Sequence, residues 1–598
     1  MKRSNGQREG STVMADARLG ATRLGWIVGL LALTVGVGLG SSGRLTYHEA
    51  FVAQAAREMV AKGFGTGWLV PTVGGQTWLE KPPLLIWAVA SLGLALGGVT
   101  EWSARIPSAL AAAGVALGVA LLAARRFGPT VGLLAGLIQA STGWIILRGR
   151  LGEADIVLAA IVTGLMVAFD RLRMGDIKAA PADPSILRGP HRSTAARPLA
   201  VAAASGNRPY PGIEIEGDSH ECRGLQIADR KSQNTDDGPL AICNLQSAIC
   251  DEFPESASNP DLTGWRWAFF GLLGATALVK GIGFGAALML PATVAVLAWD
   301  RDRSAIRHLL SVRGAIVAAT LALAWPIAVS VRVPEALSLW TMHVTDRFAS
   351  HPEHFIGGPR WQYLPAVLLQ AMPWTPLALL GMGPSLVRAW RDRGGGDRLL
   401  WAWAVVPVLV LSAATIKNAH YAIHALPPWS IWAALGLVRV ARILGRRPWW
   451  TPPRIRRAGV GLFATLGLAT AFGYLFVAPR LDARGREWAY CEAIGRTLDP
   501  HTPLVCLYED WDRKPYATPF GPVPHDWAIR LFSFERPATW RQGVPDLIDR
   551  PLNQPFALLA RDRDRPALNA VGKVEVISKG PSVRFDRTFT LFWVTPKS

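Results

Sequence analysis

Long apolar runs alternate with short stretches rich in arginine and lysine along this 598-residue chain. A helix that crosses a lipid bilayer needs about 20 consecutive, mostly apolar residues. The apolar runs predict about eleven membrane-spanning helices of this kind. We place them at residues 22–42, 104–123, 129–147, 155–171, 264–279, 283–299, 313–332, 362–386, 399–415, 425–441 and 458–478.

The basic residues predict an orientation for these spans. Cytoplasmic loops of membrane proteins carry an excess of lysine and arginine. If the N-terminal segment 1–21 is cytoplasmic, clusters such as Arg125-Arg126 and those within 439–457 all face the cytoplasm, provided that the apolar run 82–98 does not cross. That run is only about 17 residues long and begins Pro82-Pro83, so we expect a juxtamembrane helix at the outer surface.

Two polar parts interrupt or follow the apolar regions 22–171 and 264–479. Residues 172–263 are rich in Ser, Pro, Asp and Asn and poor in large apolar residues, which predicts a disordered cytoplasmic insert. An odd number of spans puts residues 480–598 outside, where short apolar runs separated by turns predict a small soluble α/β domain. The predicted fold class is therefore an all-α polytopic membrane protein with a C-terminal α/β domain.

Composition supports a membrane protein and argues against a nucleic-acid partner. Half of the residues (50%) are hydrophobic and only 18% are charged, against roughly a quarter charged in soluble proteins. The 25 tryptophans fit residues that anchor helices at membrane interfaces. The net charge of +19 lies in short clusters beside apolar runs and forms no single basic patch.

Ionisable side chains gather in the predicted outer loops, close to the ends of the apolar runs. Each has an ordinary explanation alone: a helix cap, a local ion pair, or a long side chain that reaches the interface. Together on one side of the membrane they indicate a functional site. The first outer loop, 43–103, holds His48, Glu49, Arg57, Glu80 and Lys81, and later loops hold Glu153, Asp155, His343, Arg347, Lys417, His420 and Tyr421.

The order of these residues resembles a known family. The first loop resembles that of the bacterial aminoarabinose-transferase and protein-mannosyltransferase superfamily, whose members have the GT-C fold and use polyprenyl-phosphate sugars. The resemblance spans residues 20–478 apart from the insert. It is carried by His48-Glu49, Ala56-Arg57-Glu58-Met59, Trp68-Leu69-Val70-Pro71, Glu80-Lys81-Pro82-Pro83, Gly149-Arg150 with Asp155, Lys280-Gly281, Arg347-Phe348 and Lys417 with Tyr421.

The resemblance implies a glycosyltransferase of the bacterial inner (cytoplasmic) membrane, with a cytoplasmic N-terminus and a periplasmic C-terminal domain. It implies transfer of a sugar from a polyprenyl-phosphate donor to an envelope lipid, glycan or protein at the outer membrane face. The implied catalytic residues are Glu49, Asp155 and His48. The donor phosphate would lie against Lys81, Arg57, Lys417 and Tyr421, and Glu80, Glu153, Arg347 and His420 would complete the site.

Physical chemistry agrees with these roles. A cation in a partly dry site stabilises the negative charge that grows on a leaving phosphate. A carboxylate beside the acceptor can take its proton. The sequence requires no cofactor, although Glu80, His48, His343 and His420 are residue types that bind a divalent metal.

One position departs from the family pattern. The family begins its first loop with Asp-Glu, whereas this chain has His48-Glu49. An imidazole with an ordinary pKa of about 6.5 can also act as a base. Two alternative interpretations remain open at this point: a transporter or flippase of lipid-linked substrates, and a catalytically inactive membrane scaffold.

Overall fold

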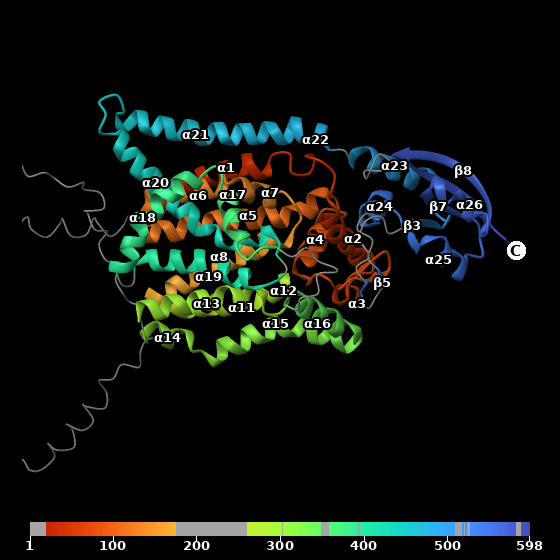
Figure 1. Cartoon of the computed structure of the whole chain (residues 1–598), viewed down its shortest axis with the longest axis horizontal. Helices are drawn as coiled ribbons and strands as arrows, with labels where there is room; N and C mark the ends of the chain where they lie inside the picture. The colour runs from red at the N-terminus through yellow and green to blue at the C-terminus, as the bar shows by residue number, and fades with distance from the viewer. Residues whose placement is uncertain are drawn as a thin grey trace, which may run out of the picture. The chain divides into compact units, whose positions relative to one another are not determined.

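The computed structural model describes residues 19–174, 260–301, 303–348, 358–392, 395–415, 417–482, 484–508, 517–518, 521–522, 527–581 and 588–597. The predicted insert (172–263) and N-terminal segment (1–21) lie almost wholly outside these residues. The described part is mainly helical, with a small sheet near the C-terminus (Figure 1). Its N-terminal half contains α1 (Ala21–Leu31) with the π-helical turn η1 (Ala32–Gly36), α2 (Tyr47–Ala61), α3 (Thr66–Leu69), α4 (Leu84–Ala95), α5 (Glu101–Phe127), α6 (Pro129–Ala140), α7 (Gly143–Gly149) and α8 (Ala154–Met174).

Beyond the insert, the chain continues as a second series of helices. These are α11 (Pro260–Ala275), α12 (Ala277–Lys280), α13 (Phe284–Asp300), α14 (Arg303–Leu309), α15 (Val312–Arg332), α16 (Glu335–Phe348), α17 (Tyr363–Gln370), α18 (Thr375–Arg391), α19 (Gly396–Ala413), the 3-10 helix η2 (Ala419–Ala425), α20 (Pro427–Leu444), α21 (Pro452–Phe472), η3 (Gly473–Val477) and α22 (Ala478–Leu481).

The described residues confirm a multi-span helical membrane protein. Four helical stretches among them are long and apolar enough to cross a membrane: α5, α15, α19 and the continuous stretch Pro452–Leu481. Two bent pairs raise this number to six, namely α6 with α7 at 60° and α17 with α18 at 112°. Each of the predicted spans overlaps one helix or two consecutive helices, and the crossing of the shorter ones stays a prediction.

Helix α4 occupies the run that we expect to lie flat at the outer surface. It has 12 residues. At about 1.5 Å per residue it is roughly 18 Å long, well short of the roughly 30 Å hydrocarbon core. Its length therefore agrees with a juxtamembrane helix.

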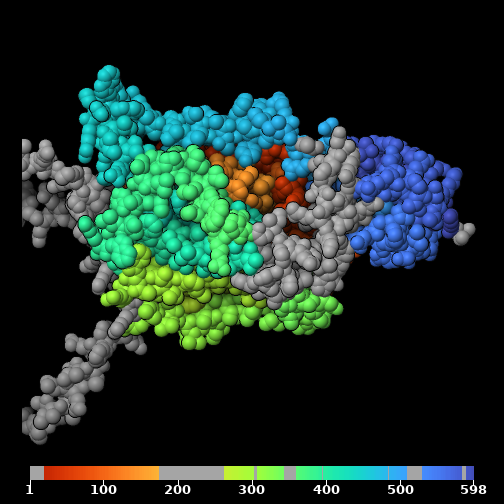
Figure 2. Space-filling model, in the orientation of Figure 1, coloured from red at the N-terminus to blue at the C-terminus, as the bar shows by residue number. Residues whose placement is uncertain are grey.

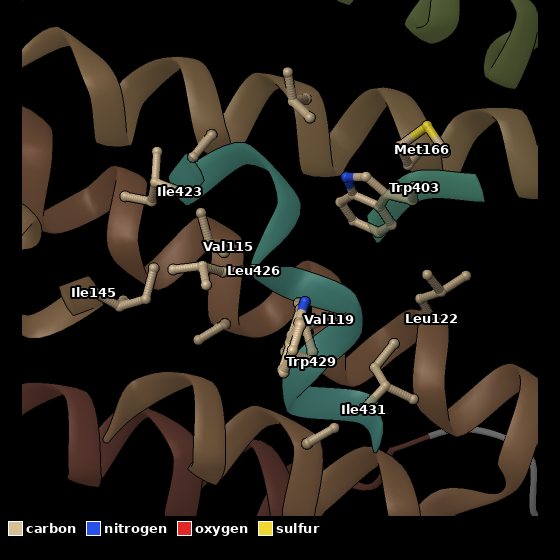
Figure 3. Close-up of a cluster of buried hydrophobic side chains, with 14 of the residues drawn as sticks. Val115, Val119, Leu122, Ile145, Met166, Trp403, Ile423, Leu426, Trp429 and Ile431 are labelled. Carbon is tan, nitrogen blue, oxygen red and sulfur yellow. The ribbon is translucent and has the colours of Figure 1, made fainter. Parts of the chain in front are cut away.

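The core of the helical region is filled by aliphatic and aromatic side chains that are almost fully buried. Helices α5, α6 and α8 run side by side (Figure 1), and α20 packs on α6 and α18. Figure 3 shows Val115 and Val119 of α5 next to Leu426, which precedes α20, and Trp429 in the first turn of α20. A glycine allows α18 and α20 to pack closely against each other. A Cβ at Gly381 of α18 would lie only 2.0 Å from the Trp432 carbonyl oxygen of α20.

Buried ion pairs tie four helices together at one end of α8. Asp170 of α8 pairs with Arg126 of α5, and Asp300 of α13 accepts from Arg173 of α8. Arg398 of α19 lies 3.0 Å from the second oxygen of Asp300. Asp155 lies at the opposite end of α8, about 22 Å from Asp170 at helical rise.

The C-terminal residues form the predicted small α/β domain. Its five-stranded sheet has the order β6-β3-β7-β9-β8; β3 is parallel to β6 and β7, and β9 is antiparallel to β7 and β8. The strands are β3 (Leu504–Tyr508), β6 (Thr539–Gln542), β7 (Phe556–Arg561), β8 (Gly572–Pro581) and β9 (Thr588–Pro596), and the helices are α23 (Arg484–Thr497), α24 (Trp527–Phe534), α25 (Gly543–Asp549) and α26 (Arg565–Leu568).

Candidate active site

An ion pair between Asp155 and Lys280 lies at the centre of the candidate site. Lys280 Nζ is 2.8 Å from Asp155 Oδ1, and both side chains are more than nine-tenths buried. Asp155 is in the first turn of α8, and Lys280 ends the short helix α12. Gly281, at φ +92°, stops that helix with a backbone conformation that favours glycine. His420 Nε2 of η2 lies 3.7 Å from the second oxygen of Asp155.

Aromatic rings support the Lys280 ammonium. Its Nζ lies 4.5 Å from the ring centroid of Tyr421 and 5.9 Å from that of Phe284. The two rings pack edge to face at 5.2 Å. A cation over an aromatic face is attracted by the ring quadrupole, so the rings hold the ammonium beside Asp155.

Lys81 brings a second ammonium group to the same place. Its charge interacts with those of Lys280, Asp155 and Glu80, which places it within electrostatic reach of all three. Burial and then the positive charge of Lys280 lower the pKa of Lys81 below its ordinary value. Among the described residues Lys81 has no hydrogen bond or ion pair, which leaves its ammonium available to an anionic ligand.

Glu80 lies next to Lys81 in the loop before α4. Burial raises the pKa of Glu80, and the charge of Lys81 opposes that rise. The ammonium groups of Lys81 and Lys280 thus lie near the Asp155 carboxylate and near Glu80, whose ionised form is disfavoured by burial.

Two histidines of η2 complete the cluster. Burial lowers the pKa of His420 to about 4 and that of His424 to about 3, so both imidazoles are neutral at pH 7. The His424 ring is fully buried, and its two nitrogens have no hydrogen-bond partner among the described residues. The sequence prediction did not include His424, because a single histidine in an apolar segment carries no distinguishing pattern.

Glu49, one of the predicted catalytic residues, is buried and joins three segments of the chain. Its carboxylate lies 2.8 Å from Arg105 Nε and accepts a hydrogen bond from the Gly152 backbone N–H at 3.0 Å. It also accepts from the Thr46 N–H at the start of α2, where the Thr46 side chain accepts from the Glu49 N–H in return. The capping box fixes the start of α2, and the hydrogen bond from Gly152 makes Glu49 a positioning residue for the segment that leads to Asp155. His48, the adjacent residue, is exposed, with its ring 3.9 Å from that of Tyr47.

Glu153 and Lys417, two further predicted site residues, contact other groups than Lys81 and Asp155. Glu153 pairs with Arg148, and burial raises the pKa of Glu153. Lys417 donates to the Ala414 carbonyl oxygen at 2.5 Å.

Arg57 joins α2 to the C-terminal domain. It donates to the Phe532 carbonyl oxygen of α24 at 2.7 Å, and its guanidinium lies 3.8 Å from the Phe532 ring centroid. None of these contacts connects Arg57 with Lys81. His343 and Arg347 belong to α16, but their side chains lie outside the described residues.

The metal candidates can be compared with the geometry only in part, since His343 is outside the described side chains. The described residues contain no group of three or more His, Cys, Asp or Glu side chains placed to hold a metal ion. A metal requirement therefore stays untested.

The fold and the charged cluster define a multi-span membrane protein with a candidate site at the ends of its helices. A family model described as dolichyl-phosphate-mannose-protein mannosyltransferase matches residues 80–172, which include Lys81 and Asp155. This match confirms the resemblance inferred from the loop motifs.

Curated relatives and a solved structure extend this similarity. The undecaprenyl phosphate-alpha-4-amino-4-deoxy-L-arabinose arabinosyl transferase of Erwinia tasmaniensis is 32% identical over 213 residues, covering 34% of this chain and 36% of that protein. The enzyme of the same name from Edwardsiella ictaluri is 33% identical over 169 residues, covering 26% and 28%. The matched region thus spans about a third of the curated relatives' length.

The crystal structure of ArnT from Cupriavidus metallidurans bound to undecaprenyl phosphate matches with a TM-score of 0.63. The match has 18% sequence identity and covers 96% of this chain and 98% of that one. The apo state of the same protein gives the same TM-score. At this identity the likeness shows the fold, so the chain has the fold of ArnT from its helical region through its C-terminal domain.

Proposed function

We propose that this protein is a membrane glycosyltransferase that moves a sugar from a polyprenyl-phosphate donor to an envelope lipid, glycan or protein acceptor. The observation that carries the proposal is the Lys81 ammonium, which has no ion pair among the described residues and lies within electrostatic reach of the Asp155–Lys280 ion pair. The curated relatives bear names that include undecaprenyl phosphate and arabinosyl transfer, which supports the donor class. The match of the family model over Lys81 and Asp155 supports the choice of residues.

In this mechanism the donor phosphate binds against Lys81, with Lys280 behind it. The acceptor oxygen attacks the anomeric carbon, a new carbon–oxygen bond forms, and the bond from that carbon to the phosphate oxygen breaks. The leaving polyprenyl phosphate gains negative charge, which the buried ammonium stabilises more strongly than water does.

Asp155 and His420 act on the acceptor side. Asp155 is held by Lys280, and its second oxygen faces the neutral His420 imidazole. A carboxylate or a neutral imidazole can take the proton of an acceptor hydroxyl as the new bond forms. The transferred proton would then leave through the solvent-accessible side of His420, whose side chain is 29% exposed.

The proposal includes the eleven-span arrangement with the site at the periplasmic face and the C-terminal domain in the periplasm. It is supported by the position of Asp155 at one end of α8 and of the Asp170 ion pairs at the other. Arginine-rich loops cluster at the Asp170 end, as the cytoplasmic side of a membrane protein would require.

The test is donor turnover by the purified full chain in detergent. The protein is given a radiolabelled polyprenyl-phosphate sugar and a bacterial envelope extract, and free polyprenyl phosphate is quantified. The proposal predicts its release together with label in an acceptor fraction. A transporter would leave the donor chemically intact, and an inactive scaffold would also release nothing, so intact donor after long incubation contradicts the proposal.

A further inference from the structure

A second charged cavity lies apart from the Lys81–Asp155 site. It has a volume of about 350 Å³ and lies between the segment that follows η1, the end of α7 and the helix α22. Four arginines line it, together with Tyr474 and a single carboxylate: Arg44, Arg105, Arg150, Arg484 and Asp482. None of the residues that form the Lys81–Asp155 site lines this cavity. In Figure 2, orange and red surface is recessed beneath the bright-blue end of the helix that runs from α21 into α22.

Three of these arginines have their charge balanced by a carboxylate within the protein. Each makes a close ion pair: Arg105 with Glu49 at 2.8 Å, Arg44 with Glu101 at 2.9 Å, and Arg484 with Asp482 at 2.7 Å. The Arg44 and Arg484 side chains are 38% and 28% exposed, so their remaining N–H groups are accessible at the cavity mouth.

Arg150 is the exception. It is 2% exposed and has no carboxylate partner among the described residues. Its guanidinium donates to the carbonyl oxygens of Thr34, Val35 and Val37 at 2.8 to 3.2 Å and lies 3.7 Å from the Tyr474 ring centroid, while Nε has no partner among the described residues. Carbonyl dipoles do not cancel a full charge, and an uncompensated buried charge is costly. An anion in the cavity would supply the missing countercharge.

One side of the cavity is apolar. Leu147, Leu151, Ala478 and Leu481 contribute to its lining. Leu481 is 77% exposed, and Phe476, on the preceding turn, is 47% exposed. Exposed apolar side chains beside a basic cavity fit an amphiphile that has an anionic head and a hydrocarbon chain.

We propose that this cavity binds the phosphate group of an anionic lipid. The phosphate lies beside Arg150 and takes hydrogen bonds from Arg44 and Arg484 at the mouth, and the acyl chains leave along Leu481. A guanidinium presents paired donors that match phosphate oxygens. A cavity of this size lies within the range of small-ligand sites and holds a head group, not a whole lipid. The binding does not depend on the sugar transfer proposed above.

The experiment is equilibrium binding of radiolabelled phosphatidic acid to the detergent-purified full chain. Phosphatidylcholine and inorganic phosphate serve as competitors. We expect phosphatidic acid to bind, phosphatidylcholine to compete at least tenfold more weakly, and Arg484→Gln to weaken binding by roughly tenfold. Arg480→Gln is the matched control, since Arg480 is exposed on α22, four residues before Arg484, and does not line the cavity; it should bind as the natural protein does.

A second variant separates a lipid from free phosphate. Leu481→Asn replaces an exposed apolar side chain at the mouth with a neutral polar one, so it should weaken phosphatidic acid binding and leave competition by inorganic phosphate unchanged. Arg150 also donates hydrogen bonds to carbonyl oxygens of η1, so its substitution could affect folding. Arg150→Lys keeps the positive charge, and this variant should therefore retain more phosphatidic acid binding than Arg150→Gln. Equal binding by Arg484→Gln and Arg480→Gln would overturn the site. If phosphatidylcholine competes as strongly as phosphatidic acid does, the ligand is not an anionic lipid. If inorganic phosphate competes as strongly and Leu481→Asn leaves phosphatidic acid binding unchanged, the cavity binds free phosphate and the lipid proposal is wrong.

Discussion

The Asp155 carboxylate lies 2.8 Å from the Lys280 ammonium, although the two residues stand on opposite sides of the insert in the sequence. This pair joins the start of α8 to the end of α12. The Lys280 ammonium faces one Asp155 oxygen, and the second oxygen lies 3.7 Å from His420 Nε2. The pair therefore couples the anion-binding side of the candidate site, at Lys81, to its acid–base side.

If Asp155 and Lys280 act as a unit, their substitutions should not be additive. Asp155→Asn and Lys280→Met are each expected to lower the rate of sugar transfer by roughly a hundredfold or more. The double variant should be no slower than the slower single variant, because the first change already disrupts the unit. Transfer rates of the four proteins, with melting temperatures to confirm folding, provide the test. Multiplied effects would mean that the two residues act independently.

The lowered pKa of Lys81 predicts the alkaline limit of donor binding. Only the ammonium form attracts phosphate, and its pKa lies below the ordinary 10.5 because of burial and Lys280. Donor affinity should therefore fall as the pH rises through this lowered pKa, before pH 10.5. Lys81→Arg keeps its charge to higher pH, so the limit should move upward. An unchanged pH profile in Lys81→Arg would remove Lys81 from the donor site.

The protonation of Lys81 should also affect the free energy of unfolding, which should increase with pH where donor affinity decreases. The unfolded chain holds the Lys81 proton more tightly than the folded protein does. Without donor, stability should therefore rise as the pH increases through the interval between the two pKa values. Melting temperatures of the natural protein and Lys81→Met at several pH values would show whether this rise disappears in the variant.

Glu49 and His48 should differ sharply despite being neighbours. Glu49→Gln weakens a fully buried ion pair with Arg105, for which a loss of about 3 to 5 kcal/mol in unfolding free energy is expected. His48→Ala alters an exposed residue and should change stability by no more than about 0.5 kcal/mol. Melting curves of both variants test this contrast, and transfer assays on His48→Ala and His48→Asp test the base role separately. A fully stable Glu49→Gln protein without activity would instead support Glu49 as a catalytic residue.

Arg57 should act through the C-terminal domain. Its contacts with Phe532 predict that Arg57→Ala increases protease cleavage of that domain and leaves the KM for the donor unchanged. Arg57→Lys should lose part of the stacking and show a smaller increase. A raised donor KM at normal protease resistance would instead support the phosphate-binding role predicted from the motif.

The sequence predicts the helical membrane region and the α/β domain because both depend on local patterns. Apolar runs determine where helices form, and the turn-separated short runs of the tail determine its strands. The number of true crossings is less predictable. The bends between α6 and α7 and between α17 and α18 arise from packing, which no single run encodes.

The candidate site could be predicted only in part. Lys81 and Asp155 have recognisable motifs, but their proximity to Lys280 depends on how α4, α8 and α12 meet. The structural role of Glu49 had a local signal, since Thr46 stands three residues before it as in a capping box. No local sequence signal indicated the ion pair between Glu49 and Arg105, because Arg105 lies on a separate helix.

The most direct test of the account is a single-turnover measurement with a radiolabelled polyprenyl-phosphate sugar and purified protein. The natural chain is compared with Lys81→Ala, Asp155→Asn and the control Lys62→Ala, whose lysine is exposed in the same loop region, residues 43–103. The account predicts a measurable transfer rate for the natural chain and the control, and a loss of roughly a hundredfold or more for Lys81→Ala and Asp155→Asn. Equal rates in all four proteins, or no transfer by the natural chain, would contradict it.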